Sequence, residues 1–297
     1  MKALCRSMVL VVVILVAVVQ VASAGGLLPN FPILLGTTGA CNNVSSGGPC
    51  TETSTLVQLD SKTGKLIKTI GPVGYTVNGL AWDRTSWKLY ASTAIGCGLS
   101  GSVCPFHGLI TINPLTGAGK PVNPNAPNFN LGAVDAPIHS INVDVFGHMV
   151  GWLDKFPAGN PTDSYVRIDQ HTGIATEFTD TGINTNQNGL AFGEFNLLWN
   201  IDSPKRLGNN PPTQTAYLIN PYNGKQFASV PVTPPTVAAL GDFKPGTNLY
   251  YGLNFQGFDP LGATSIVKID LDANLGKGTA STLGQTVNFL HTLAFIP

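Results

Sequence analysis

Apolar and polar residues alternate in five short segments of the chain, each of which ends in Asp or Asn. In every copy the residues one and three positions before the Asp or Asn are apolar, and the residue between them is usually polar. A period of two is that of a β-strand with one buried face. The pattern therefore predicts strands at Leu56–Asp60, Leu109–Asn113, Tyr165–Asp169, Ala216–Asn220 and Ile266–Asp270.

Each repeat continues into a hairpin and then into a second half. A glycine follows the Asp or Asn by four residues in four copies, at Gly64, Gly117, Gly173 and Gly224, and it supplies the positive φ of a tight turn. The fifth copy reaches Gly276 two residues later. The second half is a strand such as Asn78–Asp83 or Asn188–Phe192, and the strands expected after such segments are Lys88–Ala91, His148–Leu153, Asn196–Ile201 and Asn248–Leu253.

Four strands per unit at a spacing of 50 to 56 residues predict the blades of a β-propeller. Phe289–Phe295 has no partner strand after it and Phe31–Gly36 has no inner strand before it, so the two segments would complete one blade. We expect an all-β, five-bladed β-propeller of four-stranded antiparallel blades, whose ring is closed by the N- and C-terminal strands in one blade. A β-sandwich is the structural alternative, but sandwiches lack this repeat.

The repeat resembles the exported members of the broad YVTN/NHL-like and WD-like β-propeller superfamily. Their blades often contain Leu-Tyr-x-Ile-Asp-x-x-Thr-Gly and then Gly-Leu-Ala-Phe-Asp, and this chain has Leu59-Asp60 to Thr63-Gly64 and Gly79-Leu80-Ala81-Trp82-Asp83. The resemblance covers almost all of the chain after residue 24. It implies the fold but no function, since propellers serve as binding proteins, scaffolds and enzymes.

The N-terminal segment has the features of a secretory signal peptide. Lys2 and Arg6 precede an apolar run from Met8 to Val19, and Val21–Ala24 offers a cleavage site before Gly25. A retained membrane anchor would need about 20 apolar residues. We therefore expect residues 1–24 to be removed and residues 25–297 to form a single domain. We also expect the protein to be secreted or periplasmic, with no membrane span after cleavage.

Charge and cysteine content narrow the classes of partner. Removing the signal peptide changes the formal charge from 0 to −2, and the only basic pair is Lys205-Arg206, which argues against nucleic acid as a partner. In an oxidising compartment the local pairs Cys41 with Cys50 and Cys97 with Cys104 predict two disulfides. A zinc site is the alternative, but the spacing is not that of zinc ligands. We expect a monomer, and Asn43-Val44-Ser45 is a glycosylation sequon if the source is eukaryotic.

Loop lengths give the ring two different faces. The turns inside the repeats are short, whereas the connections on the other face are long and carry both predicted disulfides; they are Thr38–Ser54, Ala94–Gly108, Val122–Pro137, Asp154–Ser164, Ser203–Thr215 and Phe255–Thr264. Long loops on a rigid scaffold commonly carry binding. We therefore expect the long-loop face to be the binding face, unless the loops only cover the ring.

At that face the residues that begin each inner strand should point toward the central opening. They are Asn78, His139, Asn188, Ala238 and His291, with Asp135 nearby. Two imidazoles and two amides could bind a polar ligand or a divalent metal, or only hydrogen-bond to the backbone. A catalytic zinc commonly has three protein ligands and only Asp135 offers a third, so no metal is assigned. His148 and His171 fall in turns of the opposite face and are not expected to join them.

The acidic residues and motifs do not identify a reaction. A glycosidase needs two carboxylates beside the scissile bond, yet Glu52 is the only glutamate expected near the long-loop face. No nucleophile elbow, zinc-protease motif or P-loop occurs. The favoured interpretation is a secreted propeller that binds a glycan or protein, with Phe106, Phe129, Phe156, Phe255 and Phe258 as contacts. The alternative is a metal-assisted hydrolase or lyase centred on His139, His291 and Asp135.

Overall fold

The computed structural model describes residues 32–38, 53–93, 108–125, 138–153, 162–185, 188–202, 213–236, 238–254, 265–272, 276–287 and 290–297. The chain divides into two units, Met1–Phe31 and Pro32–Pro297. The first unit lies outside the described residues, and so do the expected signal peptide and the cysteines of both expected disulfides. Those expectations stay predictions.

The described part of the second unit is almost entirely β-structure, arranged mainly in four-stranded antiparallel sheets. One sheet joins the two ends of the unit in the order β20 (Leu290–Ile296), β1 (Ile33–Thr38), β2 (Thr55–Leu59), β3 (Leu66–Pro72). The next contains β4 (Val77–Asp83), β5 (Lys88–Thr93), β6 (Leu109–Ile112) and β7 (Gly119–Pro121). A third contains β8 (Ile138–Val143), β9 (Met149–Leu153), β10 (Ser164–Ile168) and β11 (Ala175–Asp180).

The remaining strands form one eight-stranded sheet made of two antiparallel groups. The first group is β12 (Asn188–Phe192), β13 (Leu198–Asp202), β14 (Gln214–Ile219) and β15 (Gln226–Thr233). The second is β16 (Ala238–Phe243), β17 (Leu249–Asn254), β18 (Ser265–Asp272) and β19 (Lys277–Gln285). A short parallel pairing of the outer strands β15 and β19 links the groups, through Val232 with Gly278 and Thr233 with Thr279. The five alternating segments of the sequence are strands β2, β6, β10, β14 and β18, which confirms their assignment.

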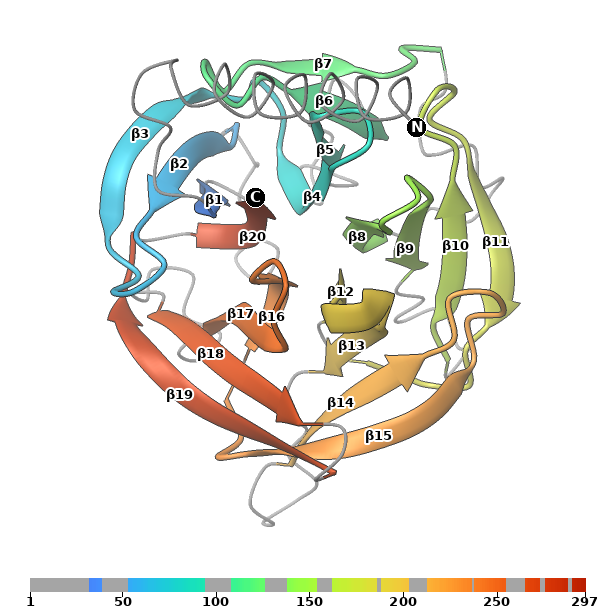
Figure 1. Ribbon diagram of the computed structural model, residues 1–297. Coiled ribbons are helices and arrows are strands. Elements are labelled where there is room, and N and C mark those ends of the chain that lie inside the picture. The colour runs from blue at the N-terminus through green and yellow to red at the C-terminus, as the bar shows by residue number, and fades with distance from the viewer. Residues whose placement is uncertain are drawn as a thin grey trace, which may run out of the picture. The chain divides into compact units, whose positions relative to one another are not determined.

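The sheets pack as in a β-propeller. Strand β4 packs against β8, β8 against β12, β12 against β16, β16 against β20, and β20 against β4. Figure 1 shows these strands innermost and β3, β7, β11, β15 and β19 outermost. Apolar side chains from facing sheets fill the space between them, as where Trp152 and Tyr165 pack with Leu190 and Leu198. Full burial of each such side chain stabilises the fold by about 1.5–3 kcal/mol.

Three buried polar side chains hydrogen-bond to the backbone at, or just before, the start of the next inner strand. Ser54 Oγ accepts the Val77 amide at 2.9 Å, and Gln214 Oε1 accepts the Thr236 amide at 2.8 Å. Asp163 Oδ2 accepts the Thr185 amide at 2.7 Å and the Trp152 indole N–H at 2.9 Å. Because each acceptor lies just before or at the start of β2, β10 or β14, the same device recurs from sheet to sheet and positions the inner strands.

Candidate functional site

The residues expected around the central opening occupy corresponding places at the starts of the innermost strands. Asn78 and His139 are the second residues of β4 and β8, Asn188 and Ala238 are the first residues of β12 and β16, and His291 is the second residue of β20. The side chains of His139 and Asn188 lie outside what the structure describes, as does Asp135. The grouping of the backbone positions agrees with the sequence analysis, and the binding role of this set stays a prediction.

Three members of this set share a local distortion. Val77 pairs with Thr93 and Gly79 with Ser92, which leaves Asn78 as the extra residue of a β-bulge. By the same pairing, His139 is the extra residue between Ile138 and Ser140, and His291 between Leu290 and Thr292. Bulges redirect a side chain away from the regular alternation and are common beside functional sites.

Little of the long-loop face lies within the described residues. Glu52 and the five phenylalanines expected there, Phe106, Phe129, Phe156, Phe255 and Phe258, are outside them. We therefore turn to the opposite face, called here the short-turn face. It consists of the turns β4–β5 (84–87), β8–β9 (144–148), β10–β11 (169–174), β12–β13 (193–197), β14–β15 (220–225) and β16–β17 (244–248).

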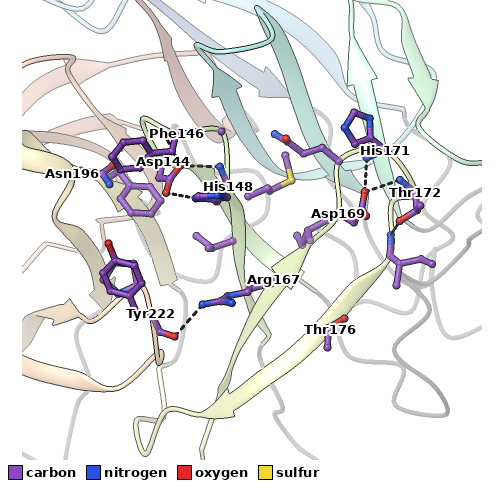
Figure 2. A pocket seen from close by; sticks show the side chains of 18 residues that line it. Asp144, Phe146, His148, Arg167, Asp169, His171, Thr172, Thr176, Asn196 and Tyr222 are labelled. Carbon is purple, nitrogen blue, oxygen red and sulfur yellow. Dashed lines mark hydrogen bonds and ion pairs between the residues drawn. The ribbon is translucent and has the colours of Figure 1, made fainter.

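A hollow of about 820 Å³ lies on the short-turn face between strands β8–β11 and the turns of β12–β15. We call it the lateral pocket. Phe146, Asn196 and Tyr222 lie on one side of it, and Asp169, His171 and Thr172 lie on the other, with His148 and Arg167 between them (Figure 2). Its volume is within the usual range of small-molecule sites, about 300–1,000 Å³.

The polar groups of the lateral pocket are held in place by their own turns. Asp144 Oδ1 accepts the amides of Phe146 and His148 at 2.9 and 2.8 Å, while Asp144 Oδ2 contacts His148 Nδ1 at 2.9 Å. This contact directs the other imidazole nitrogen away from Asp144. Asp169 Oδ1 accepts the amides of Thr172 and His171, and these bonds lower the pKa of Asp169 below its ordinary value.

Arg167 is fixed across the boundary between two sheets. Its Nη2 donates to the carbonyl oxygen of Tyr222 at 3.0 Å, and its guanidinium carbon lies 4.0 Å from the ring centroid of Phe178. This single hydrogen bond to Tyr222 leaves several of the five guanidinium N–H groups for a ligand. Tyr222 and Phe146 are 76% and 70% exposed, so the pocket presents aromatic faces beside an immobilised planar donor.

A second hollow, of about 420 Å³, lies where the innermost strands reach the short-turn face. We call it the inner-strand pocket. The inner strands mostly have alanine at one corresponding position, at Ala81, Ala191 and Ala294, but β8 and β16 have Asn142 and Asp242 there. Both polar side chains line this pocket, together with Arg84, Glu194 and Lys244.

Asp242 is a buried carboxyl with every oxygen in use. Its Oδ1 accepts the Asn142 side-chain amide at 3.3 Å and the Phe243 amide at 2.9 Å, and its Oδ2 accepts the Phe295 amide of β20 at 2.9 Å. Burial raises the pKa of Asp242 to about 6, although these hydrogen bonds and Arg84 act in the opposite direction. Ser140 has a similar role between β8 and β12, because its Oγ accepts the Leu190 amide at 2.8 Å.

Two further exposed aromatic side chains lie on the short turns, and one of them, Phe195, lines the inner-strand pocket. Trp87 is 70% and Phe195 is 84% exposed, and both have a φ of 56°. A bulky residue at such a positive φ is uncommon and costs about 1–2 kcal/mol. Strained backbone is common at functional sites, so these two residues support the choice of the short-turn face as a candidate binding face.

Sequence reasoning missed this face because it considered only the loops. His148 and His171, which were set aside as lying opposite the expected site, line the lateral pocket instead. A signal was present in the sequence, namely Asn142 and Asp242 in place of alanine and the aromatic residues at turn positions 87, 146, 195 and 222. The combination of Arg84 and Lys244 could not be found from the sequence, because the two residues line one pocket only when the strands are arranged around a centre.

The described residues offer no obvious catalytic or metal centre. Among them, no group of three or more His, Cys, Asp or Glu residues is placed to hold a metal ion. The His148–Asp144 pair resembles the orienting half of a catalytic triad, but within the described part of the chain no hydroxyl or thiol hydrogen-bonds to His148. No helix in that part is long and apolar enough to cross a membrane.

Comparison with known proteins assigns no family. No family model and no curated protein matches the sequence. The solved structures that are similar in shape include an engineered GH43 glycoside hydrolase with endo-xylanase and exo-arabinofuranosidase activity, at 13% identity and a TM-score of 0.47, over 71% of this chain and 41% of that one. This chain therefore spans less than half of that protein.

Two further structures cover more of their own chains. A gluconolactonase from Xanthomonas campestris has 12% identity and a TM-score of 0.45, over 87% of this chain and 77% of that one. The PQQ-bound aldose sugar dehydrogenase from Streptomyces coelicolor has 12% identity and a TM-score of 0.45, over 86% and 78%. At such identities and TM-scores, these likenesses transfer neither an activity nor a site to this chain.

Proposed function

We propose that the protein is an exported, five-bladed propeller that binds a carbohydrate in the lateral pocket of its short-turn face. Five blades are supported by the circular packing of β4, β8, β12, β16 and β20, and ring closure by the pairing of β1 with β20. The pairing of these strands would hold the two ends of the propeller unit in one blade, so that the ring has no free edge.

The observation that carries the binding proposal is the composition of the lateral pocket. Phe146 and Tyr222 offer exposed aromatic faces, and Arg167, His148 and Asn196 offer polar groups whose positions are fixed by hydrogen bonds. A sugar ring has apolar C–H faces that pack on aromatic rings and hydroxyls that pair with planar donors and acceptors. The pocket therefore suits a polyhydroxylated ligand better than an apolar one.

The pocket favours binding over hydrolysis. A glycosidase acts through two carboxylates that flank the scissile bond. In the lateral pocket Asp144 and Asp169 instead accept backbone amides of their own turns, and these bonds hold the carboxylates to the turns. The two acids thus have a structural role, so we expect no turnover of the bound sugar.

Isothermal titration of residues 25–297 against a panel of neutral and acidic oligosaccharides tests this proposal. Tyr222→Ala and Phe146→Ala should each weaken binding at least fivefold, because central aromatic contacts commonly contribute more than 1 kcal/mol. Phe227→Ala is the matched control, since Phe227 is a 60% exposed aromatic residue on β15 that does not line the pocket. Binding of no oligosaccharide, or equal losses in all three variants, would refute the proposal; a protein ligand would then be sought by affinity capture.

The second candidate is a metal-assisted hydrolase or lyase at the central opening. The bulges at Asn78, His139 and His291 favour it, because they set three polar residues apart from the regular strand alternation. A thermal shift with a divalent metal that chelator reverses, and that His139→Ala and His291→Ala abolish, would support this candidate. Shifts that are the same in the wild type and both variants would exclude it.

Export and cross-linking belong to the same proposal. We expect the secreted protein to begin at Gly25 and to contain disulfides Cys41–Cys50 and Cys97–Cys104, which would limit the freedom of two loops of the long-loop face. Mass spectrometry of the secreted protein identifies its first residue, and mass spectrometry of its non-reduced peptides identifies the disulfides. A retained residue 1–24 segment would contradict export by cleavage, and four alkylated cysteines would contradict the disulfides.

A further inference from the structure

The inner-strand pocket contains two cationic side chains, Arg84 and Lys244, and the charge of Arg84 acts on the buried carboxyl of Asp242 without a direct ion pair between them. Neither Arg84 nor Lys244 makes an ion pair or a side-chain hydrogen bond with another residue in the described part of the chain. Arg84 is exposed and Lys244 is half-buried, so both can reach a ligand in this pocket. A guanidinium carries five N–H donors and an ammonium three.

The acidic side chains of the same pocket have little accepting capacity left. Both oxygens of Asp242 accept hydrogen bonds, from Asn142, Phe243 and Phe295. Both oxygens of Asp144 are used within its own turn. Glu194 accepts the Asn248 side-chain amide at 3.1 Å. The hydrogen-bonding capacity that remains in the pocket is therefore mostly that of donors, and donors on cations select an oxyanion.

The inner-strand pocket adjoins the lateral pocket. The two share Asp144, Phe146, Phe192 and Asn196 as lining residues, so one extended ligand can occupy both. A small free anion would contact only Arg84 and Lys244 in the inner-strand pocket. A chain of sugar rings would use the aromatic faces of the lateral pocket and the cations of the inner-strand pocket together.

We infer that the ligand is an acidic oligosaccharide whose oxyanion is held by Arg84 and Lys244 while its other rings lie on Phe146 and Tyr222. This inference rests on the proposed carbohydrate binding and specifies its ligand class. Arg84 can hold a carboxylate or a sulfate through two parallel N–H bonds, and Lys244 adds a second positive charge. The three carboxyl groups of the pocket oppose more than one oxyanion, so a single charged ring is expected at this position.

Titration with matched glycan pairs tests the inference. Oligogalacturonate is compared with its methyl ester, which has the same rings without the charge, and sulfated galacto-oligosaccharide is compared with the unsulfated form. We expect at least one charged form to bind tenfold more tightly than its neutral partner at low salt, and this ratio to fall in 0.5 M NaCl because of screening. Preference for the uronate or for the sulfate identifies the source of the oxyanion.

Variants then locate the effect. Arg84→Gln and Lys244→Gln should each remove most of the tenfold preference, because the charged form loses more affinity than the neutral form does. Lys65→Gln, which removes an exposed cation outside both pockets, is the control and should keep the preference. Equal binding of charged and neutral forms, or a preference that persists in both pocket variants, would overturn the inference and leave carbohydrate binding intact. Absence of any glycan binding would overturn both.

Discussion

Replacing Asp242 with alanine should change how the stability of the fold depends on pH. Alanine occupies the corresponding position in β4, β12 and β20, so the fold already accommodates it at Ala81, Ala191 and Ala294. The pKa of Asp242 is raised from 3.8 to about 6, with burial as the main cause. The folded state therefore binds a proton to this carboxyl more tightly than the unfolded chain does.

The sign of the effect follows from proton linkage. Stability from a raised carboxyl pKa is fully present below pH 3.8 and is lost as the pH rises to about 6. Since one pKa unit corresponds to about 1.4 kcal/mol, the wild type should lose about 3 kcal/mol relative to Asp242→Ala between pH 3.5 and 7.5. Asp60, Asp83 and Asp169 have lowered pKa values and favour the opposite trend, but they are present in both proteins and cancel in the difference.

Urea unfolding followed by tryptophan fluorescence at several pH values measures this difference. The free energy of unfolding of the wild type minus that of Asp242→Ala should decrease steadily from pH 3.5 to 6 and then stay level. Asp242→Asn serves as a second, non-titrating variant and should show the same pH dependence with a different offset, because its amide cannot accept all three hydrogen bonds. Parallel curves for the wild type and both variants would refute the reasoning.

Three further changes probe the packing and the turns. Asp163→Ala removes an acceptor that is shared by the Trp152 indole, the Thr185 amide and the Thr185 hydroxyl, and should lower the free energy of unfolding by about 1–3 kcal/mol, as read from urea titration; an unchanged midpoint would contradict this. Gly189→Ala places a Cβ against the Tyr250 hydroxyl and should cost about 1–3 kcal/mol, with a smaller loss in a Tyr250→Phe background; equal losses in both backgrounds would show that the contact is not responsible. Phe195→Asn should raise the melting temperature, because asparagine tolerates a φ of 56° better than phenylalanine; a lower melting temperature would show that the ring contributes packing that outweighs the strain.

Much of the strand order could be predicted because alternation and unpaired segments are local features. Val57 and Leu59 are buried and Gln58 between them is less so, as the repeat pattern indicated. The pairing of β1 with β20 agrees with the expectation that the first and last strands share a sheet. Such features need no knowledge of distant contacts, because each side of a strand is already marked by its sequence.

The starts of the second strands were less well predicted, for local reasons. One strand was predicted to begin at His148, but β9 begins at Met149. The amide and imidazole of His148 are bound to Asp144 in the turn instead. Another strand was predicted to begin at Asn196, whereas β13 starts at Leu198. The reason is that Glu194–Asn196 forms a 3₁₀ turn in which Phe195 and Asn196 have positive φ. In both cases turn geometry outweighed strand propensity.

The candidate site illustrates why function was harder to predict than fold. Arg84 and Lys244 lie 160 positions apart in the sequence, and nothing near either residue marks it as a ligand contact. What distinguishes them is the state of the neighbouring acids, because both oxygens of Asp144 and both oxygens of Asp242 already take part in hydrogen bonds. The position that is alanine in three inner strands thus has two consequences where it is Asn142 and Asp242. The pair ties β8, β16 and β20 together, and it engages both oxygens of Asp242 in bonds to amides, so that neither oxygen forms a direct ion pair with Arg84 or Lys244.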